Sequence, residues 1–369
     1  MGQVLILPKL VFETGSIAQL GSELALLGVS RPLLISDRGI EAVGIVAKVR
    51  QTVPHLAAVF LDTPQNPTAA GADASVVVYR QAGCDGIVAL GGGSVLDTAK
   101  LAAALVMGDC TAVELIGNYA KITQVAPLIA IPTTIGTGSE SSPVAALHIQ
   151  AGGPAIGTRG PLMVPKVALC DPALTRSLPR HLIAATGIDA LSHCIEGFFA
   201  NPENPVIDAL ALDGAGRVFT DISAALGPGG DAARASLMAA AFAGGAAIHK
   251  GIGPAHAIAL TCADQDLHHG TLIAIALPHT THLLALHLPE KAARLAKAMD
   301  LPEGANIGAA LAGLIKSLDL PTTLGDAGYR IDDPDATIRA FASNPVNCSS
   351  PYAPTEEEYR AIGAAIGCV

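Results

Sequence analysis

The stretch GIVALGGGSVLDTAK, residues 86–100, places a buried apolar strand, a glycine-rich turn and a helix in direct succession. Because Gly91, Gly92 and Gly93 lack a Cβ, the backbone of this turn can approach a ligand closely. The free N–H groups at the start of the following helix favour an anion, and Ser94 is placed to cap that helix or to donate to a phosphate oxygen. The stretch predicts a pyrophosphate site. The alternative is a glycine turn that allows tight packing of a helix on a sheet.

Apolar runs bounded by turn residues recur on both sides of this stretch: RPLLIS (31–36), AAVFLD (57–62), PLIAIP (127–132) and KVALCD (166–171). Helical segments such as AAGADASVVVYRQAG (69–83) lie between several of them. Strands that are apolar on both faces and alternate with helices predict a parallel sheet covered by helices. We expect residues 1–13 to add an outlying strand or hairpin.

After about residue 178 the strand-like runs give way to long Ala- and Leu-rich stretches, such as residues 181–200 and 233–248. These predict a mostly helical second domain, with the boundary near residues 174–181. We therefore expect an α/β domain over residues 1–178 and a helical domain over residues 179–369. A last helix is expected to begin at Thr355, because Thr355 and Glu358 have the spacing of a capping box.

Composition excludes several classes of protein. A formal charge of −10 argues against nucleic acid or an anionic membrane surface as a partner. The 7 cysteines are scattered without a CxxC pair, which is typical of a reducing compartment. The N-terminus lacks the pattern of a signal peptide, and the uncharged stretch at residues 235–248 is shorter than a membrane span. We therefore expect a cytoplasmic protein that does not enter a membrane.

Four residues of the second half form a candidate metal site. Asp189 and His193 are four residues apart in a predicted helix and so share one face, and His256 and His269 follow later. One carboxylate and three imidazoles suit Zn²⁺ or Fe²⁺ and leave room for a substrate oxygen. Spacing by itself is a modest signal, because a single buried His is more often a core residue. Glu196 lies on the same helical face, where it would support a ligand or serve as a solvated or capping residue.

Two further loops favour a dinucleotide. Asp37 ends an apolar strand, where a carboxylate accepts the ribose hydroxyls of NAD and repels the 2′-phosphate of NADP. By itself Asp37 is equally well explained as a turn residue. The run IPTTIGTGSE, residues 131–140, offers the hydroxyls of Thr133, Thr134 and Thr137 directly after a strand. Ligands of open α/β sheets bind at this end of the strands.

Taken together, GGGSVLDTAK, IPTTIGTGSE, the segment around Asp189 and His193, and the later histidines resemble the iron-dependent, group III alcohol dehydrogenase family. The resemblance implies a Rossmann-like dinucleotide-binding domain followed by an all-α domain, an architecture like that of dehydroquinate synthase. It also implies that the four protein ligands of a catalytic divalent metal are Asp189, His193, His256 and His269. The implied cofactor-binding residues are Asp37, Asn66, Gly92, Gly93, Ser94, Asp97, Thr133, Thr134 and Thr137.

The chain departs from the family pattern beside two of these ligands. Many members carry a His four residues after the third ligand, where this chain has Leu260. Before the last ligand the usual Pro is replaced by His268. With Leu260 in place of a histidine, His268 is a candidate for relaying the proton. The pocket is therefore expected to differ from that of common relatives, although all four ligand positions are filled.

The resemblance implies a metal-dependent oxidoreductase that transfers a hydride between an alcohol, or its aldehyde or ketone, and NAD. Fe²⁺ is the expected metal with Zn²⁺ as the alternative, and NAD is expected rather than NADP. The expected partners are a small alcohol or aldehyde substrate and further copies of the chain, in a homodimer or higher homo-oligomer. One alternative is a reductase of an acidic substrate, similar to maleylacetate reductase. A lyase of the dehydroquinate synthase type ranks lower, because only 22 Lys and Arg are present to bind a phosphorylated substrate.

Overall fold

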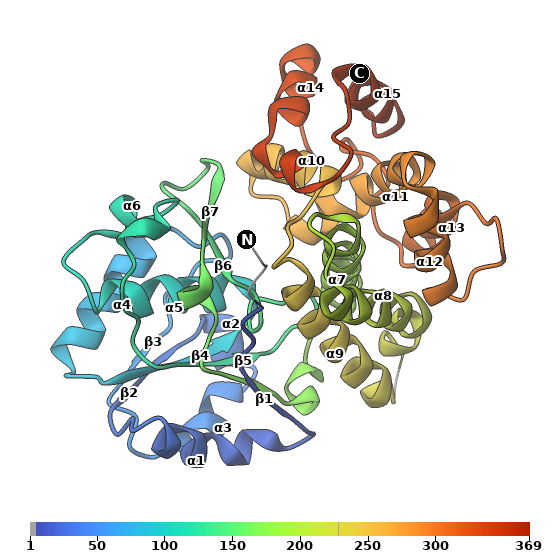
Figure 1. The fold of residues 1–369 in the computed structure, drawn as a ribbon. Helices are drawn as coiled ribbons and strands as arrows, with labels where there is room; N and C mark the ends of the chain where they lie inside the picture. Colours follow the sequence, from blue (N-terminus) through green and yellow to red (C-terminus); the bar gives the residue numbers. More distant parts are fainter. Residues whose placement is uncertain (1–4, 228) are drawn as a thin grey trace. The chain divides into compact units, whose positions relative to one another are not determined.

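The computed structural model describes residues 5–227 and 229–369. The chain divides into two compact units, Ile6–Leu178 and Pro179–Val369 (Figure 1). Each unit has its own secondary structure and its own core. Short 3₁₀ helices join several elements: η1 (Ser16–Gln19), η2 (Tyr119–Lys121), η3 (Pro161–Met163), η4 (Pro172–Thr175), η5 (Ala263–Gln265) and η6 (Pro345–Ser349).

The first unit is built on a parallel sheet, which confirms the predicted fold class. Within the described residues the sheet has six strands: β1 (Lys9–Phe12), β2 (Pro32–Ile35), β3 (Ala58–Phe60), β4 (Gly86–Gly91), β5 (Leu128–Pro132) and β8 (Val167–Cys170). Their order is β1-β8-β5-β4-β2-β3, and every neighbouring pair is parallel. Strand β1 is an edge strand of this sheet, so the described part of residues 1–13 supplies an outlying strand, the first of the two alternatives expected there.

The structure adds one element that the apolar runs did not predict. Strands β6 (Val144–His148) and β7 (Ala155–Arg159) form a separate antiparallel pair. Both strands are partly exposed, whereas every residue of the central strands β4 and β5 of the main sheet is buried. A run that is buried on both faces is easier to recognise from sequence than one that is half exposed.

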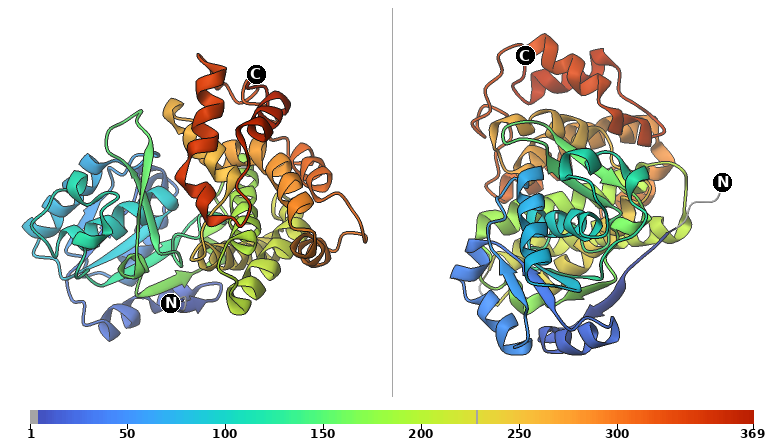
Figure 2. Two further views of the ribbon diagram at one scale, coloured as in Figure 1. Left: turned by 45° about the horizontal axis from the view of Figure 1, so that its top comes forward. Right: turned by 90° about the vertical axis from the view of Figure 1, so that its left-hand side faces the viewer.

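Helices cover both faces of the sheet, as the alternating pattern predicts. Leu33 and Ile35 of β2 pack in a core with α4 and α5, whereas Leu34 between them packs with α1 and α3 on the other face. Figures 1 and 2 show the helices on these two sides. The helices of this unit are α1 (Leu20–Leu26), α2 (Arg38–Ala42), α3 (Ile45–Thr52), α4 (Ala69–Gln81), α5 (Gly93–Leu105) and α6 (Ala112–Leu115).

The strand order places a switch point between β2 and β4. Strand β3 lies on one side of β2, and β4, the next strand along the chain, lies on the other. The chain therefore leaves the ends of β2 and β4 in opposite directions, which opens a crevice that open α/β sheets use for ligands. The Ser36 hydroxyl at the end of β2 donates to the Leu90 carbonyl of β4 at 2.6 Å, which fixes the two ends together.

Within its described residues, every regular element of the second unit is a helix, as predicted. Its helices are α7 (Arg180–Phe199), α8 (Pro205–Ala225), α9 (Asp231–Ala247), α10 (Pro254–Thr261), α11 (His269–His287), α12 (Pro289–Ala298), α13 (Ile307–Ser317), α14 (Pro334–Ser343) and α15 (Glu356–Ala365). The side chain of Thr355 caps α15 in a capping box with Glu358, which confirms the predicted start of that helix. Helices α14 and α15, drawn in red, pack against each other (Figure 2).

Helix α7 is the core of this unit, and every residue from Gly187 to Phe199 is buried. Small residues let its neighbours approach closely: a Cβ added at Gly197 would lie 2.7 Å from the Cβ of Ala247 in α9. Among the described helices, α7 is the one long and apolar enough to cross a membrane, but 89% of its apolar window is buried inside the protein. This burial is typical of a core helix.

Candidate functional site

Helix α7 carries the first two predicted metal ligands on one face. Pro179 precedes its first turn, where its missing N–H costs no hydrogen bond, and the helix runs unbroken to Phe199. The four-residue spacing brings His193 Nε2 to 3.8 Å from Asp189 Oδ1. Both side chains are almost completely buried.

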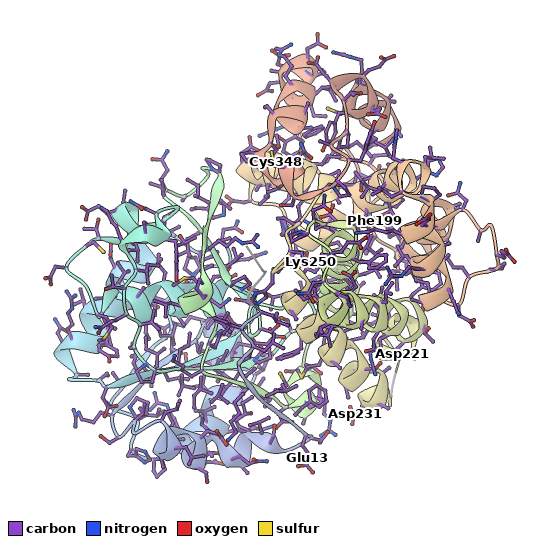
Figure 3. All side chains as sticks on the ribbon, viewed as in Figure 1. Glu13, Phe199, Asp221, Asp231, Lys250 and Cys348 are labelled. Atoms are coloured by element: carbon purple, nitrogen blue, oxygen red, sulfur yellow. The ribbon has the colours of Figure 1, made fainter. Side chains whose placement is uncertain are left out.

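The end of α7 is fixed by two buried lysines. Lys250 donates to the Phe198 carbonyl at 3.1 Å and to Asp208 Oδ1 at 2.5 Å, and Lys291 donates to the same Phe198 carbonyl at 3.3 Å. Figure 3 labels Lys250 and Phe199 in this region. A helix C-terminus has free carbonyls and a negative dipole end, so two ammonium groups stabilise it there. The helix that carries Asp189 and His193 is therefore held firmly in place.

The other two predicted ligands come from neighbouring helices. His256 lies in the first turn of α10, and His269 is the first residue of α11. The donor atoms of Asp189, His256 and His269 all lie within 4.8 Å of one another. His193 stands beside this group, with its ring centroid 5.0 Å from that of His256. Residues as far apart in sequence as 189 and 269 are thus brought to one place.

Buried atoms of this cluster have hydrogen-bonding capacity that the protein leaves unused. Asp189 Oδ1 and His256 Nε2 are buried and have no hydrogen-bond partner among the residues that the structure describes. A buried polar atom without a partner costs about 1–3 kcal/mol, more when it is charged. Buried atoms without a partner, in a cluster whose ligand atoms lie within 4.8 Å of one another, form a set of ligands that a cation would complete.

The electrostatics of the cluster follow from burial and from the close packing of its members. Burial raises the pKa of Asp189, and the nearby histidines oppose that shift. Removal from water lowers the pKa of His269, an effect that Asp189 opposes and the other imidazoles reinforce. His256 behaves differently: burial would lower its pKa, but the adjacent Glu196 outweighs burial and raises it. Glu196 is therefore part of the cluster, although it is not one of the predicted ligands.

His268 and Leu260, the two departures from the family pattern, lie close to the predicted ligands in sequence. His268 is the residue before α11, and its Nδ1 is buried without a hydrogen-bond partner in the described chain. Burial lowers the pKa of His268, and Asp189 opposes that effect. Leu260 is half-buried in the last turn of α10. The role of His268 in proton transfer stays a prediction.

The predicted nucleotide-binding residues gather in the first unit at the carboxyl ends of the strands. Strand β4 ends at Gly91 and α5 begins at Gly93, so Gly92 is the N-cap and Ser94 is not, contrary to one of the two roles expected for it. A Cβ added at Gly92 would lie 3.1 Å from Thr134 Cγ2, and one at Gly93 would lie 2.8 Å from Thr137 Oγ1. The glycine turn and the threonine loop therefore pack against each other.

The hydroxyls around this turn differ in how they are used. Thr133 and Thr134 have buried Oγ1 atoms without a hydrogen-bond partner in the described residues, so they can donate to a ligand. The Ser94 hydroxyl donates to the Gln65 carbonyl, which joins the loop after β3 to the start of α5. Asp97 uses both of its oxygens within the protein, because Oδ1 accepts from Ser139 Oγ at 2.5 Å and Oδ2 accepts from the Ala146 backbone N–H at 2.9 Å. The buried carboxylate of Asp97 thus supports the loops around the site.

Asp37 and Asn66 occupy the loops after β2 and β3. Asp37 Oδ1 accepts from the Ile40 N–H at 2.9 Å and so caps α2. Its carboxylate has a second oxygen at the switch point of the sheet, where the sequence predicts a contact with ribose. Asn66 is half-buried between β3 and α4. The capping role of Asp37 is the turn role that the sequence left open, and it is compatible with a ligand contact through the second oxygen.

Sequence reasoning missed a buried pair of ionisable residues beneath these loops. Lys100 donates to the carbonyls of Ser142 and Val144, and burial lowers its pKa to about 8. Glu140 is 1% exposed, and burial raises its pKa to about 7. Both lie within motifs already singled out, DTAK and TGSE, but periodicity gives no sign that a charged residue points inward.

The chain is similar to known proteins over almost its whole length. A family model described as iron-containing alcohol dehydrogenase matches residues 8–172, and one described as the C-terminal part of the Fe-containing alcohol dehydrogenase family matches residues 183–366. The chain is 38% identical over 376 residues to a 4-hydroxybutyrate dehydrogenase of Cupriavidus necator, covering 98% of each protein. It is 32% identical over 329 residues to the probable alcohol dehydrogenase EutG of Escherichia coli (strain K12), covering 87% of this chain and 83% of that protein.

The fold is shared as well. The crystal structure of a 1,3-propanediol oxidoreductase superposes with a TM-score of 0.93 at 26% identity, covering 98% of this chain and 99% of that one. These matches confirm the family that the motifs resemble. The chain belongs to the iron-containing alcohol dehydrogenase family and is an oxidoreductase that interconverts an alcohol and its carbonyl compound.

Proposed function

We propose that residues 1–178 bind NAD and that residues 179–369 hold a divalent cation that activates a primary alcohol for oxidation. The ligands of the cation are Asp189, His193, His256 and His269. Fe²⁺ is the proposed metal and Zn²⁺ the alternative, since one carboxylate and three imidazoles suit both ions. The observation that carries the proposal is the cluster of donor atoms within 4.8 Å, in which Asp189 Oδ1 and His256 Nε2 have no hydrogen-bond partner in the described residues.

A divalent cation at this cluster would act as a Lewis acid on the alcohol or carbonyl oxygen. The side chains of this chain fix where that oxygen is held. Asp189 supplies the negative charge, and its burial strengthens attraction to a cation because no water screens it. The three imidazoles come from three different helices, so the packing of α7, α10 and α11 sets the geometry of the cluster.

The glycine turn and the threonine loop are the proposed site for the pyrophosphate of NAD. Gly92 and Gly93 allow close approach of the backbone, and the N-terminus of α5 favours an anion there. Thr133 and Thr134 offer hydroxyl donors. Bound NAD would supply the acceptor for the hydride of the alcohol, and the two loops would hold and orient it. NAD is proposed over NADP because the Asp37 carboxylate at the end of β2 would repel a 2′-phosphate.

We propose 4-hydroxybutyrate as the first substrate to test. The support is the 38% identity over 98% of the chain to a 4-hydroxybutyrate dehydrogenase. A substrate with a carboxylate also falls within the second function expected from sequence, reduction of an acidic compound. The pH of the reaction and the NADH/NAD ratio would decide the direction.

The test is metal analysis of freshly purified protein, followed by NADH formation with 4-hydroxybutyrate and a series of simple primary alcohols. We expect about one divalent ion per chain and stoichiometric formation of NADH. Asp189→Asn removes the charge of the cluster and should abolish both metal retention and turnover. Asp213→Asn, an exposed carboxylate on α8, is the matched control and should change neither. Full turnover of the wild type after removal of all metal by a chelator would contradict the proposal.

We further propose a cytoplasmic homo-oligomer. Strand β1 lies at the edge of the sheet, and its Leu10 and Phe12 are exposed. An edge strand with exposed apolar side chains is favourable for contact with a second chain. Light scattering after size-exclusion chromatography measures the mass, and a monomer at micromolar concentration would contradict this proposal.

A further inference from the structure

Glu196 is buried beside His256, with 2% of its surface exposed, and it is not itself one of the proposed ligands. It lies on α7, one turn after His193 and two turns after Asp189. Among the described residues, no Lys or Arg forms a hydrogen bond or ion pair with its carboxylate. Three donors from the start of α10 approach it instead.

These three contacts join α7 to the helix that carries His256. Glu196 Oε2 accepts from the Gly253 N–H at 2.8 Å and from His256 Nδ1 at 2.5 Å. Glu196 Oε1 accepts from the Ala255 N–H at 2.6 Å. Helix α10 has glycine at its N-cap and therefore no capping side chain of its own. The Glu196 carboxylate takes over that function from a neighbouring helix, and the positive dipole end of α10 stabilises its charge.

The contact with His256 determines which ring nitrogen carries the proton. An ionised carboxylate accepts hydrogen bonds and cannot donate them. Its partner Nδ1 must therefore carry a hydrogen, and in the neutral ring this leaves the lone pair on Nε2. Nε2 is the atom that is buried without a partner in the described residues. The nitrogen left free is thus the one available to the cation.

We propose that Glu196 is a positioning residue, which selects the Nδ1–H tautomer of His256, fixes the orientation of its ring and thereby sets the affinity of the site for a divalent cation. This inference rests on the proposed function, since it assumes that the cluster holds a metal. Carboxylates that accept from a metal-bound histidine raise the basicity of that ligand and hold it in place. Glu196 does this while also capping α10, so one side chain couples the start of that helix to the metal site.

Glu196→Gln separates tautomer selection from packing. The glutamine has the same shape, and its carbonyl can still accept from a backbone N–H of α10. Its NH₂ group is a donor, however, and at the position facing Nδ1 it favours the tautomer with the hydrogen on Nε2. We expect the dissociation constant for Zn²⁺ or Co²⁺ to rise about 10–100-fold, the range found when such supporting carboxylates are removed.

The measurement is competition between a chelator of known affinity and the full, metal-depleted chain, with Zn²⁺ alone and with Co²⁺ alone. Glu23→Gln is the matched control: it also replaces a buried carboxylate, but one on α1 of the first unit that pairs with Lys9 and contacts none of the ligands. We expect this control to lower the melting temperature and to leave metal affinity unchanged. If Glu196→Gln bound both ions within twofold of the wild type, or if the control lost affinity to the same extent, the inference would be overturned.

A second measurement does not depend on the folding of a variant. In the wild-type, metal-depleted chain, ¹⁵N chemical shifts of the imidazoles at alkaline pH report which nitrogen of His256 is protonated. We expect Nδ1 to be protonated, and protonation of Nε2 would overturn the inference. Failure of the wild type to bind either ion would contradict the proposed function, whereas the tautomer of His256 decides the role of Glu196 independently.

Discussion

The buried carboxyl of Glu140 predicts a measurable dependence of stability on pH. Neither of its oxygens has a hydrogen-bond partner in another described residue, and 1% of the residue is exposed. Burial raises its pKa from 4.5 to about 7, against the opposing effects of its own backbone N–H and of Lys100. Glu140→Gln removes the ionisable group and keeps the shape.

The sign follows from comparing the folded and unfolded chains. Between about pH 4.5 and pH 7 the unfolded chain releases the proton of Glu140, while the folded chain keeps it. The contribution of Glu140 to stability is therefore fully present at low pH and is lost as the pH rises toward 7. At about 1.36 kcal/mol per pKa unit, the difference between 4.5 and about 7 amounts to about 3 kcal/mol. In a unit the size of Ile6–Leu178 this is about 6–12 °C in melting temperature.

The assay is calorimetric melting of the wild type and of Glu140→Gln at about pH 5 and about pH 8. Relative to the wild type, the variant should gain several degrees on going from the lower to the higher pH. Glu303→Gln is the control, because Glu303 is already exposed, and it should change little between the two conditions. If the melting temperatures of Glu140→Gln and of the wild type changed by the same amount between the two pH values, Glu140 would not be a buried neutral acid.

Three further predictions concern the cofactor and substrate sites. Asp37→Ser keeps a capping oxygen for α2 and removes the negative charge. The ratio of kcat/KM with NAD to kcat/KM with NADP should therefore fall about tenfold, while the melting temperature stays unchanged. An unchanged ratio would show that Asp37 only caps the helix. Gly93→Ala places a Cβ 2.8 Å from Thr137 Oγ1. This change should raise the KM for NAD much more than the KM for the alcohol. If both KM values rose equally, the loop would not be specific to the cofactor. Leu260→His should shift the pH–rate profile if it restores a proton relay, and superimposable profiles would show that Leu260 shapes the pocket without affecting proton transfer.

The fold was predictable because its signals are local. Parallel strands buried on both faces appear as short apolar runs such as residues 86–90, and capping residues such as Thr355 mark where helices begin. The β6–β7 pair escaped prediction because its strands are partly exposed and carry no continuous apolar run. The sequence left residues 1–13 as either a strand or a hairpin for a different reason: the pairing of β1 with β8 joins residues more than 150 positions apart, which no local pattern reveals.

In the candidate site, too, features set by local sequence were predictable and features set by long-range packing were not. The positions of Asp189 and His193 on one helical face follow from their spacing, and the loops that follow β4 and β5 meet because parallel strands end at the same edge. The contacts of Glu196 with α10, and those of Asp97 with Ser139, depend on tertiary packing. From the sequence alone, Glu196 could support a ligand, cap a helix or be solvated. Its contacts with α10 became visible only in the structure.

Anomalous diffraction at the absorption edge of the bound metal tests the central claim most directly. For crystals of the purified protein, the account predicts one strong peak within bonding distance of Asp189 Oδ1, His256 Nε2, His193 and His269. A metal bound at another place, or no ordered metal in protein that still oxidises an alcohol with NAD, would contradict it.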